Sequence, residues 1–99
     1  MALTTQQRKY LRGLCHPLQP VVTVAGKGLT ATVIAELEAA LTKHELIKVK
    51  LRAERALRAA WTEEISKLCK TEAVQTIGQV ACFYRRNPKK PAIAFPAAS

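Results

Sequence analysis

Residues 47–52, with the sequence IKVKLR, alternate strictly between aliphatic and cationic side chains, and this alternation restricts the fold more than any other feature of the chain. Successive side chains of a β-strand point to opposite faces of a sheet, so one face of this strand is aliphatic and the other carries Lys48, Lys50 and Arg52. The aliphatic face requires a covering layer. The cationic face, which has no acid between its three like charges, is either a solvated surface or a surface that meets an anion.

Three further strands are predicted around this one. The apolar run 21–25 predicts a strand that is covered on both faces. Residues 73–86, AVQTIGQVACFYRR, predict a hairpin whose turn lies at Gly78 and Gln79. Together with 47–52, these segments provide the strands of one small sheet.

Three helices are predicted from apolar residues at helical spacing. The first begins at a capping box formed by Thr4 and Gln7 and ends before Pro17. The second begins at Thr30 and ends near residue 44, and the third covers about 54–70. The stripes expected to be buried, in chain order, are Tyr10, Leu11 and Leu14, then Val33, Ile34, Leu37 and Leu41, then Leu57, Trp61, Ile65 and Leu68.

The predicted order of elements is α-β-α-β-α-β-β. The central β-α-β unit implies a parallel pair of strands joined by a right-handed crossover, and the hairpin adds an antiparallel pair. The sequence therefore predicts an α/β fold, a single-domain sandwich of three helices on a four-stranded mixed sheet, over residues 1–88. Residues 87–99 contain three prolines, two lysines and no acid. Residues 89–99 are therefore expected to form a tail, with an extended segment at 92–95.

Positive charge is concentrated at the two ends of the chain. The 99 residues hold sixteen Lys and Arg against seven Glu and no Asp, a net charge of +9. Residues 1–35 and 73–99 each carry four bases and no acid, whereas residues 36–72 carry eight bases and all seven acids. If the two ends meet in the fold, they form an unbalanced positive surface, which is typical of proteins that bind a polyanion. The alternative is that the charge only maintains solubility, but its segregation favours nucleic acid.

The three cysteines, Cys15, Cys69 and Cys82, form no CxxC motif. Their odd number and apolar neighbours predict small core residues rather than a disulfide framework or a zinc site, and this usage fits a reducing cytosol. The first residues lack the apolar segment of a signal peptide, and no run is long enough to span a bilayer. A cytoplasmic protein with no membrane partner is expected.

Catalysis is not expected, and neither a cofactor nor a metal is predicted. There is no Asp, and the glutamates lie mostly on the surfaces of predicted helices. A hydrolase that uses Cys15 and His16 is a remote alternative, because adjacency in sequence is not a catalytic arrangement. His44 ends a predicted helix, where a capping role is expected.

The segment 24–30, VAGKGLT, joins a predicted strand to a predicted helix. It is not a P-loop, because GxxxxGK[ST] is absent, and not a dinucleotide fingerprint, which would require glycine at Ala31. Gly26 and Gly28 permit a positive φ and the close approach of a partner, with Lys27 between them and helix amides behind. Such a turn either holds one or two backbone phosphates or is a tight connection whose glycines serve geometry alone, and the turn itself does not decide between these.

Four segments carry a family resemblance: RKYLRGLCHPLQPVV, AGKGLT, HELIKVKLR and VQTIGQVACFYR occur in the order and spacing of the RNA-binding CRM domain. From about residue 3 to residue 86 the chain resembles the stand-alone bacterial form, the YhbY family. The resemblance implies a fold similar to the C-terminal domain of bacterial translation initiation factor three. It also implies RNA binding through a GxxG loop analogous to that of KH domains, and association with precursors of the large ribosomal subunit.

The GxxG loop of the family aligns with residues 25–28 of this chain. Ala25 stands in place of the first family glycine, Gly26 is an additional glycine, and Lys27 and Gly28 carry over directly. Ala25 keeps the loop geometry if its φ is negative, whereas a required positive φ would cost about 1 kcal/mol and would move the flexible point to Gly26.

The predicted function is that of a monomeric, non-enzymatic RNA-binding protein of ribosome assembly, which contacts pre-ribosomal particles. The alternative is a basic adaptor that docks an acidic protein. Specificity for RNA shape is expected, because the chain offers few aromatic side chains for base stacking. The residues expected at the RNA surface are Ala25, Gly26, Lys27, Gly28, Leu29 and Thr30 of the loop, Lys48, Lys50 and Arg52 of the strand, and Arg8, Lys9, Arg12, Arg85 and Arg86 from the two ends of the chain.

Overall fold

The computed structural model describes residues 3–95, and the order of its elements confirms the predicted α-β-α-β-α-β-β chain. Over this range the helices are α1 (Thr5–Cys15), α2 (Ala31–His44) and α3 (Arg55–Leu68). The strands are β1 (Pro20–Val24), β2 (Leu46–Leu51), β3 (Glu72–Ile77) and β4 (Val80–Tyr84).

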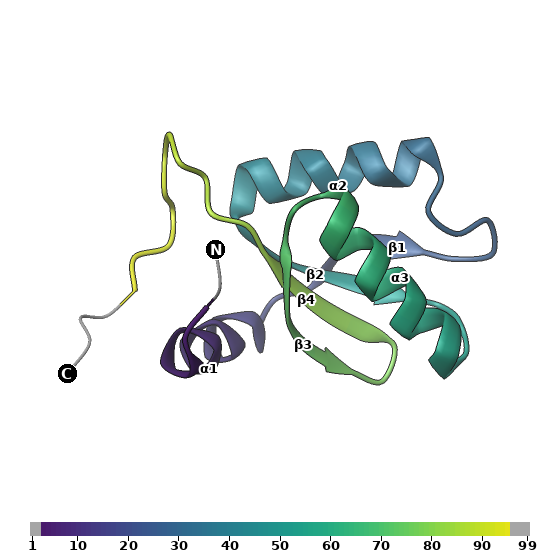
Figure 1. The fold of residues 1–99 in the computed structure, drawn as a ribbon, viewed down its shortest axis with the longest axis horizontal. Coiled ribbons are helices and arrows are strands. Elements are labelled where there is room, and N and C mark those ends of the chain that lie inside the picture. Colours follow the sequence, from purple (N-terminus) through teal and green to yellow (C-terminus); the bar gives the residue numbers. More distant parts are fainter. Residues whose placement is uncertain (1–2, 96–99) are drawn as a thin grey trace.

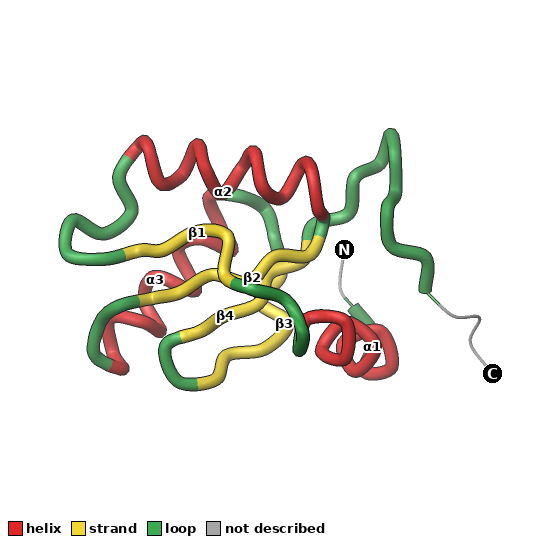
Figure 2. Tube along the Cα trace, turned by 180° about the vertical axis from the view of Figure 1, so that it is seen from behind, coloured by secondary structure: helices red, strands yellow, loops and turns green. Residues whose placement is uncertain are grey.

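The strands form one mixed sheet in the order β1-β2-β4-β3. As predicted, β1 and β2 are parallel and are joined through α2, and β3 and β4 form a hairpin whose turn is Gly78-Gln79. Strand β4 also pairs antiparallel with β2, which places β2 and β4 at the centre of the sheet. Helix α3 lies in front of the sheet in Figure 1 and behind it in Figure 2, and α1 lies beyond one end of the strands.

The sheet separates two hydrophobic clusters. Helices α2 and α3 cover one face and bury the aliphatic side of β2 together with Leu37, Leu41, Trp61 and Ile65. On the other face, α1 and the C-terminal segment cover a second cluster around Leu11. The predicted α/β sandwich with three helices on a four-stranded mixed sheet is therefore confirmed.

The starts of α1 and α2 follow the caps that the sequence predicts, and α3 begins after a cap that was not predicted. Thr4 and Gln7 form the reciprocal capping box, with hydrogen bonds of 2.9 Å and 3.0 Å between each backbone N–H and the other side chain. The Thr30 hydroxyl accepts from Val33 N, and the Glu54 carboxylate caps α3. These caps explain why each helix begins where it does.

Some predicted burial is wrong. Strand β1 is not covered on both faces, because Val22 and Val24 are buried whereas Val21 is 51% exposed. In α1, Leu11 and Cys15 are the buried residues, and Tyr10 and Leu14 are 36% and 37% exposed. In α3, Leu57 and Leu68 lie outside the core in the same way. The two helix corrections follow from a narrower contact stripe than the sequence spacing suggests, since α1 and α3 each meet the sheet along a single row.

The C-terminal segment folds back onto the domain as far as residue 95. Glu45, the buried C-cap of α2, accepts backbone N–H groups from Asn87, Ala92 and Ile93 at 2.6–2.8 Å. Phe95 packs against Tyr10 and Tyr84, with ring centroids 5.9 Å and 5.7 Å apart. The extended segment predicted at 92–95 thus contacts the body of the domain, and residues 96–99 of the predicted tail lie outside the described residues.

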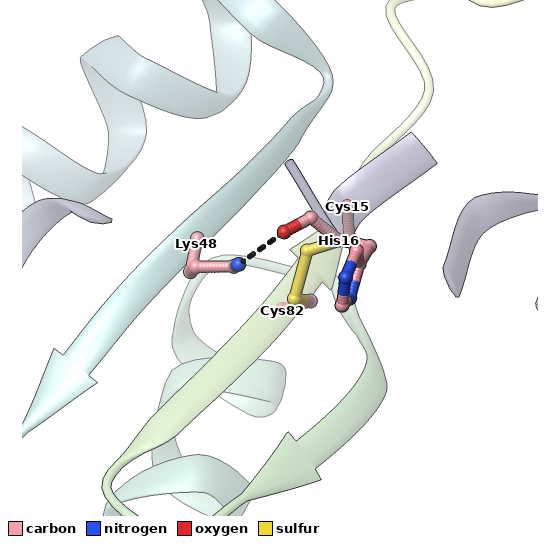
Figure 3. The surroundings of a disulfide bond; sticks show 4 residues. All are labelled: Cys15, His16, Lys48 and Cys82. Atoms are coloured by element: carbon pink, nitrogen blue, oxygen red, sulfur yellow. Dashed lines mark hydrogen bonds between the residues drawn. A yellow bond between two sulfur atoms is a disulfide. The ribbon is translucent and has the colours of Figure 1, made fainter. Parts of the chain in front are cut away.

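Cys15 and Cys82 form a disulfide between α1 and β4, which corrects the prediction that all three cysteines are unbonded core residues (Figure 3). Helix α1 ends at Cys15 against β4, whose Cys82 points to the same face of the sheet. A separation of 67 residues hid this pair from the sequence, because the contact depends on how α1 docks. Cys69 is the free, buried cysteine that was predicted.

Candidate nucleic-acid interface

The glycine turn is a four-residue reversal between β1 and α2. The carbonyl of Ala25 accepts a hydrogen bond from Gly28 N at 2.6 Å, which closes the turn and places Gly26 and Lys27 at its tip. Lys27 is exposed. Gly28 has a φ of +70°, whereas neither Ala25 nor Gly26 has a positive φ. Alanine at position 25 is therefore compatible with the loop, and the glycine that the backbone requires is Gly28.

Trp61 supports this turn from below. A Cβ placed on Gly28 would lie 3.5 Å from the indole Nε1 of Trp61, so the glycine backbone rests on the edge of the ring. Trp61 is only 7% exposed and belongs to the core cluster, as its helical spacing predicts. The ring therefore supports the backbone of the turn at Gly28, and its face is not available for base stacking.

Open space remains on the outer side of the turn. A Cβ on Gly26 would meet no atom within 4 Å, so a partner has free access to this backbone. Behind it, Thr30 caps α2 and takes the Val33 N–H, while the first helix amides cannot pair with carbonyls of the same helix. An exposed lysine, an open glycine backbone and a helix N-terminus together favour an anion.

Three connections meet at the end of the sheet where β1 and β2 finish and the β3–β4 hairpin turns. This end of the sheet is called the edge with the glycine turn. Arg52 N donates to Val24 O at 2.8 Å, which joins the start of the glycine turn to the β2–α3 connection. Leu51 N donates to Gln79 O at 2.6 Å, which joins β2 to the hairpin turn. Both Lys27 and Arg52 are exposed here, so the edge carries cations from two separate loops.

The two strand lysines lie on the face of β2 that is opposite to α2 and α3. Their β2 neighbours Ile47 and Val49 are buried beneath the helices. Lys48 donates from Nζ to the carbonyl of His16 at 3.2 Å, so it is tied to the end of α1 (Figure 3). Lys50 lies one residue before the end of β2, toward the edge with the glycine turn.

The arginines from the two ends of the chain lie at the opposite edge of the sheet. Arg8 pairs with Glu72 at 3.2 Å, and Arg85 pairs with Glu38 at 2.8 Å. The β2 strand that separates the two edges has six residues, so they are roughly 17 Å apart. Lys9, Arg12 and Arg86 are exposed at this second edge, away from Lys27.

This arrangement changes how the charge is distributed. Three acids of the middle segment contact the basic ends of the chain. Glu38 pairs with Arg85, Glu72 pairs with Arg8, and Glu45 accepts backbone N–H groups of the C-terminal segment. The bases of the middle segment are consequently left without these acids. Two of them, Arg55 and Arg58 in the first turns of α3, stand at the edge with the glycine turn. Sequence counting missed both, because acids and bases alternate along 36–72 and only the fold separates them.

The structure argues against the Cys15–His16 hydrolase, because the Cys15 sulfur is bonded to Cys82. Among residues 3–95, no three His, Cys or Glu side chains gather as a metal site requires. Within that same range, no helix has the length and apolar character needed to cross a membrane.

The fold and the site define a class: a small basic α/β domain that presents a glycine turn with an exposed lysine at one edge of a mixed sheet. Residues 3–85 match the CRS1 / YhbY (CRM) domain, and the chain belongs to this family. The family resemblance carried by the four sequence segments is thereby confirmed.

Relatives and a solved structure agree with this assignment. A protein of Pseudomonas aeruginosa, named a probable RNA-binding protein, is 51% identical over 90 residues, which cover 90% of this chain and 86% of the relative. An RNA-binding protein of Haemophilus influenzae is 46% identical over 84 residues, which cover 84% of this chain and 85% of the relative. The solution structure of a Staphylococcus aureus protein has a TM-score of 0.82 at 29% identity, over 96% of this chain and all of the other.

Proposed function

We propose that this protein binds RNA through the sheet edge that carries the glycine turn, and that its target is the RNA of large-ribosomal-subunit precursors. The observation that carries the RNA proposal is the convergence of Lys27, Arg52 and the N-terminus of α2 around an open glycine backbone. Phosphate is the ligand that such a turn suits. The names of the two bacterial relatives support RNA as the polyanion.

The proposed mode of recognition is contact with the backbone and shape of the RNA. Trp61 and Phe83 are buried, and Tyr10 is engaged with Phe95, so these rings are not free stacking platforms. The role proposed in ribosome assembly is that of a monomeric, non-catalytic binding protein. The precursor target is supported by the family resemblance of the four sequence segments.

The binding test compares the protein with Lys27→Glu and Lys43→Glu. Both changes reverse one exposed lysine, but Lys43 lies at the far end of α2, roughly 18 Å from its first residue. Affinity for labelled fragments of precursor large-subunit RNA is measured by fluorescence anisotropy across a potassium chloride series. We expect affinity to fall steeply with salt, and Lys27→Glu to bind more weakly with a salt slope shallower by about 1.

Three outcomes would contradict the proposal at different points. Equal affinity of Lys27→Glu and the unchanged protein would remove the glycine turn from the interface. A flat salt response would remove phosphate contact altogether. Crosslinking in cells with sequencing of the bound RNA tests the target, and a partner that survives nuclease treatment during purification would favour the basic adaptor instead.

A further inference from the structure

A groove of about 580 Å³ lies between α3 and the β3–β4 hairpin. Its size is within the range of sites that hold small organic groups. The lining residues that determine its character are Arg55, Arg58, Ala59, Thr62, Gly78 and Ala81. Together with Glu63, these four residues from α3 have the spacing of one helical face, so the groove runs along that helix.

The groove is left open because the residues that meet between α3 and the hairpin have small side chains or none. Ala59 on α3 and Ala81 on β4 face it, and Gly78 in the hairpin turn adds no side chain. Leu51 closes the inner end, where the core cluster begins. Ala59, Ala81 and Leu51 therefore give the groove apolar surface against which a planar group can pack.

Two arginines give the groove its charge. Arg58 donates from Nη1 to the carbonyl of Ala53 at 2.8 Å, which holds the guanidinium in place and leaves its other N–H groups for a ligand. Arg55 is exposed in the first turn of α3. The acid that lines the groove, Glu63, is paired with Lys67 at 3.3 Å. The net field at the Arg55 end favours an anion.

The groove is continuous with the edge that carries the glycine turn. Its Gly78 belongs to the hairpin turn, whose Gln79 carbonyl accepts the Leu51 N–H. The next residue, Arg52, donates its N–H to Val24 at the start of the glycine turn. Neighbouring strands are about 4.8 Å apart, so β1 and β4, which flank β2, are separated by about 10 Å. A single strand of RNA spans that distance easily.

We propose that this groove receives one unpaired nucleotide of the RNA whose backbone lies on the glycine turn, a proposal that rests on the proposed function. The base stacks against the fixed plane of the Arg58 guanidinium and lies over the alanine floor, since unstacked RNA bases pack on arginine planes. Arg55 holds the phosphate that follows. The groove thus adds a preference for RNA with an unpaired residue to an edge that otherwise reads shape.

The experiment fills the groove without changing its charge. Ala59→Leu places a larger side chain on the floor, and Ala60→Leu makes the same change at the neighbouring exposed position of α3, outside the groove. Both proteins are titrated into a fluorescein-labelled RNA hairpin with one bulged uridine and into the same hairpin without the bulge. We expect Ala59→Leu to weaken binding to the bulged hairpin about tenfold. Its affinity for the paired hairpin, and both affinities of Ala60→Leu, should be unchanged.

A second measurement uses the unchanged protein, so it holds even if Ala59→Leu fails to fold. The bulged uridine is replaced by 4-thiouridine, and its photocrosslink should map to α3 between residues 55 and 63. A crosslink confined to the glycine turn would overturn the proposal, as would an affinity of Ala59→Leu for the bulged hairpin equal to that of the unchanged protein, which is also the outcome if an acidic protein segment fills the groove. If the unchanged protein binds neither hairpin in a salt-dependent way, the proposed function itself fails.

Discussion

The guanidinium of Arg85 donates from Nη1 to Oε1 of Glu38 over 2.8 Å, and this ion pair joins the end of β4 to the middle of α2. The same side chain donates to the Cys69 carbonyl and to the Thr42 hydroxyl, at 2.9 Å and 3.1 Å. Arg85 therefore fastens three elements at the edge opposite to the glycine turn. Its charge is used inside the domain rather than offered to a partner.

Arg85→Lys keeps this charge but loses the planar fork of donors, so we expect a loss of about 2 kcal/mol in the free energy of unfolding. Urea denaturation measures it. Lys67→Ala is the control, because it breaks a pair with Glu63 in which both side chains are more than 70% exposed, and such pairs contribute well under about 1 kcal/mol. RNA affinity should not change in Arg85→Lys. A variant of full stability with weakened RNA binding would instead place Arg85 in the interface.

The two glycines of the turn should behave differently when each is replaced by alanine. Gly28 has a φ of +70°, so Gly28→Ala should lower the free energy of unfolding by about 1–2 kcal/mol. Gly26 has no positive φ and open space around it, so Gly26→Ala should leave stability unchanged while it crowds the RNA backbone and weakens binding. Urea denaturation and anisotropy separate the two effects. Equal stability of both variants would mean that the turn does not need glycine at position 28.

The elements of this fold were accessible from the sequence because each carries a local signal. The alternation in β2, the Thr4–Gln7 box and the Gly78 turn depend on residues close in the chain, and each predicts the element that the structure contains. The distribution of charge was not accessible in this way. Whether Glu72 neutralises Arg8 depends on how α1 docks against β3, which is a contact across 64 residues.

The candidate site also has a part that local sequence signals predict and a part that depends on long-range packing. The glycine turn is a local motif, and the family pattern locates it, but the structure shows which glycine needs a positive φ. The positions of Arg55 and Arg58 follow from the docking of α3 over the hairpin, and no spacing in the sequence indicates the groove beside them. Long-range packing decides which of sixteen cations remain available to a partner.

Glu45 should be the residue that keeps the C-terminal segment in place. Its carboxylate accepts N–H groups from Asn87, Ala92 and Ile93, and an amide side chain offers only one oxygen and turns an NH₂ group toward a donor. We expect Glu45→Gln to cost about 1–3 kcal/mol and to speed hydrogen exchange at residues 92 and 93. Glu36→Gln, at an exposed site of the same helix, is the control. Unchanged exchange at 92 and 93 would show that other contacts hold the segment.

Cys69 should make stability fall at alkaline pH. Burial, together with a hydrogen bond to Glu38 and its charge, raises the pKa of the Cys69 thiol from 9.0 to about 11. Between these pH values the unfolded chain loses the proton and the folded chain keeps it. The contribution to stability is therefore complete below pH 9 and is lost as the pH rises toward 11. Urea denaturation at several pH values should show a steeper alkaline decline for the unchanged protein than for Cys69→Ala, and parallel curves would contradict the raised pKa.

The disulfide between Cys15 and Cys82 should make a large contribution to stability, and a reducing agent should remove that contribution. It closes a loop across 67 residues, and loop-closure entropy for that length corresponds to about 4 kcal/mol. The unfolding midpoint in urea should therefore drop on addition of dithiothreitol. The double variant Cys15→Ala, Cys82→Ala should unfold at the reduced midpoint under both conditions. Thiol counting in guanidinium provides the independent check, because one reactive thiol is expected before reduction and three after it. Three thiols before reduction, with no effect of dithiothreitol on the midpoint, would show that the two cysteines pack together without a bond.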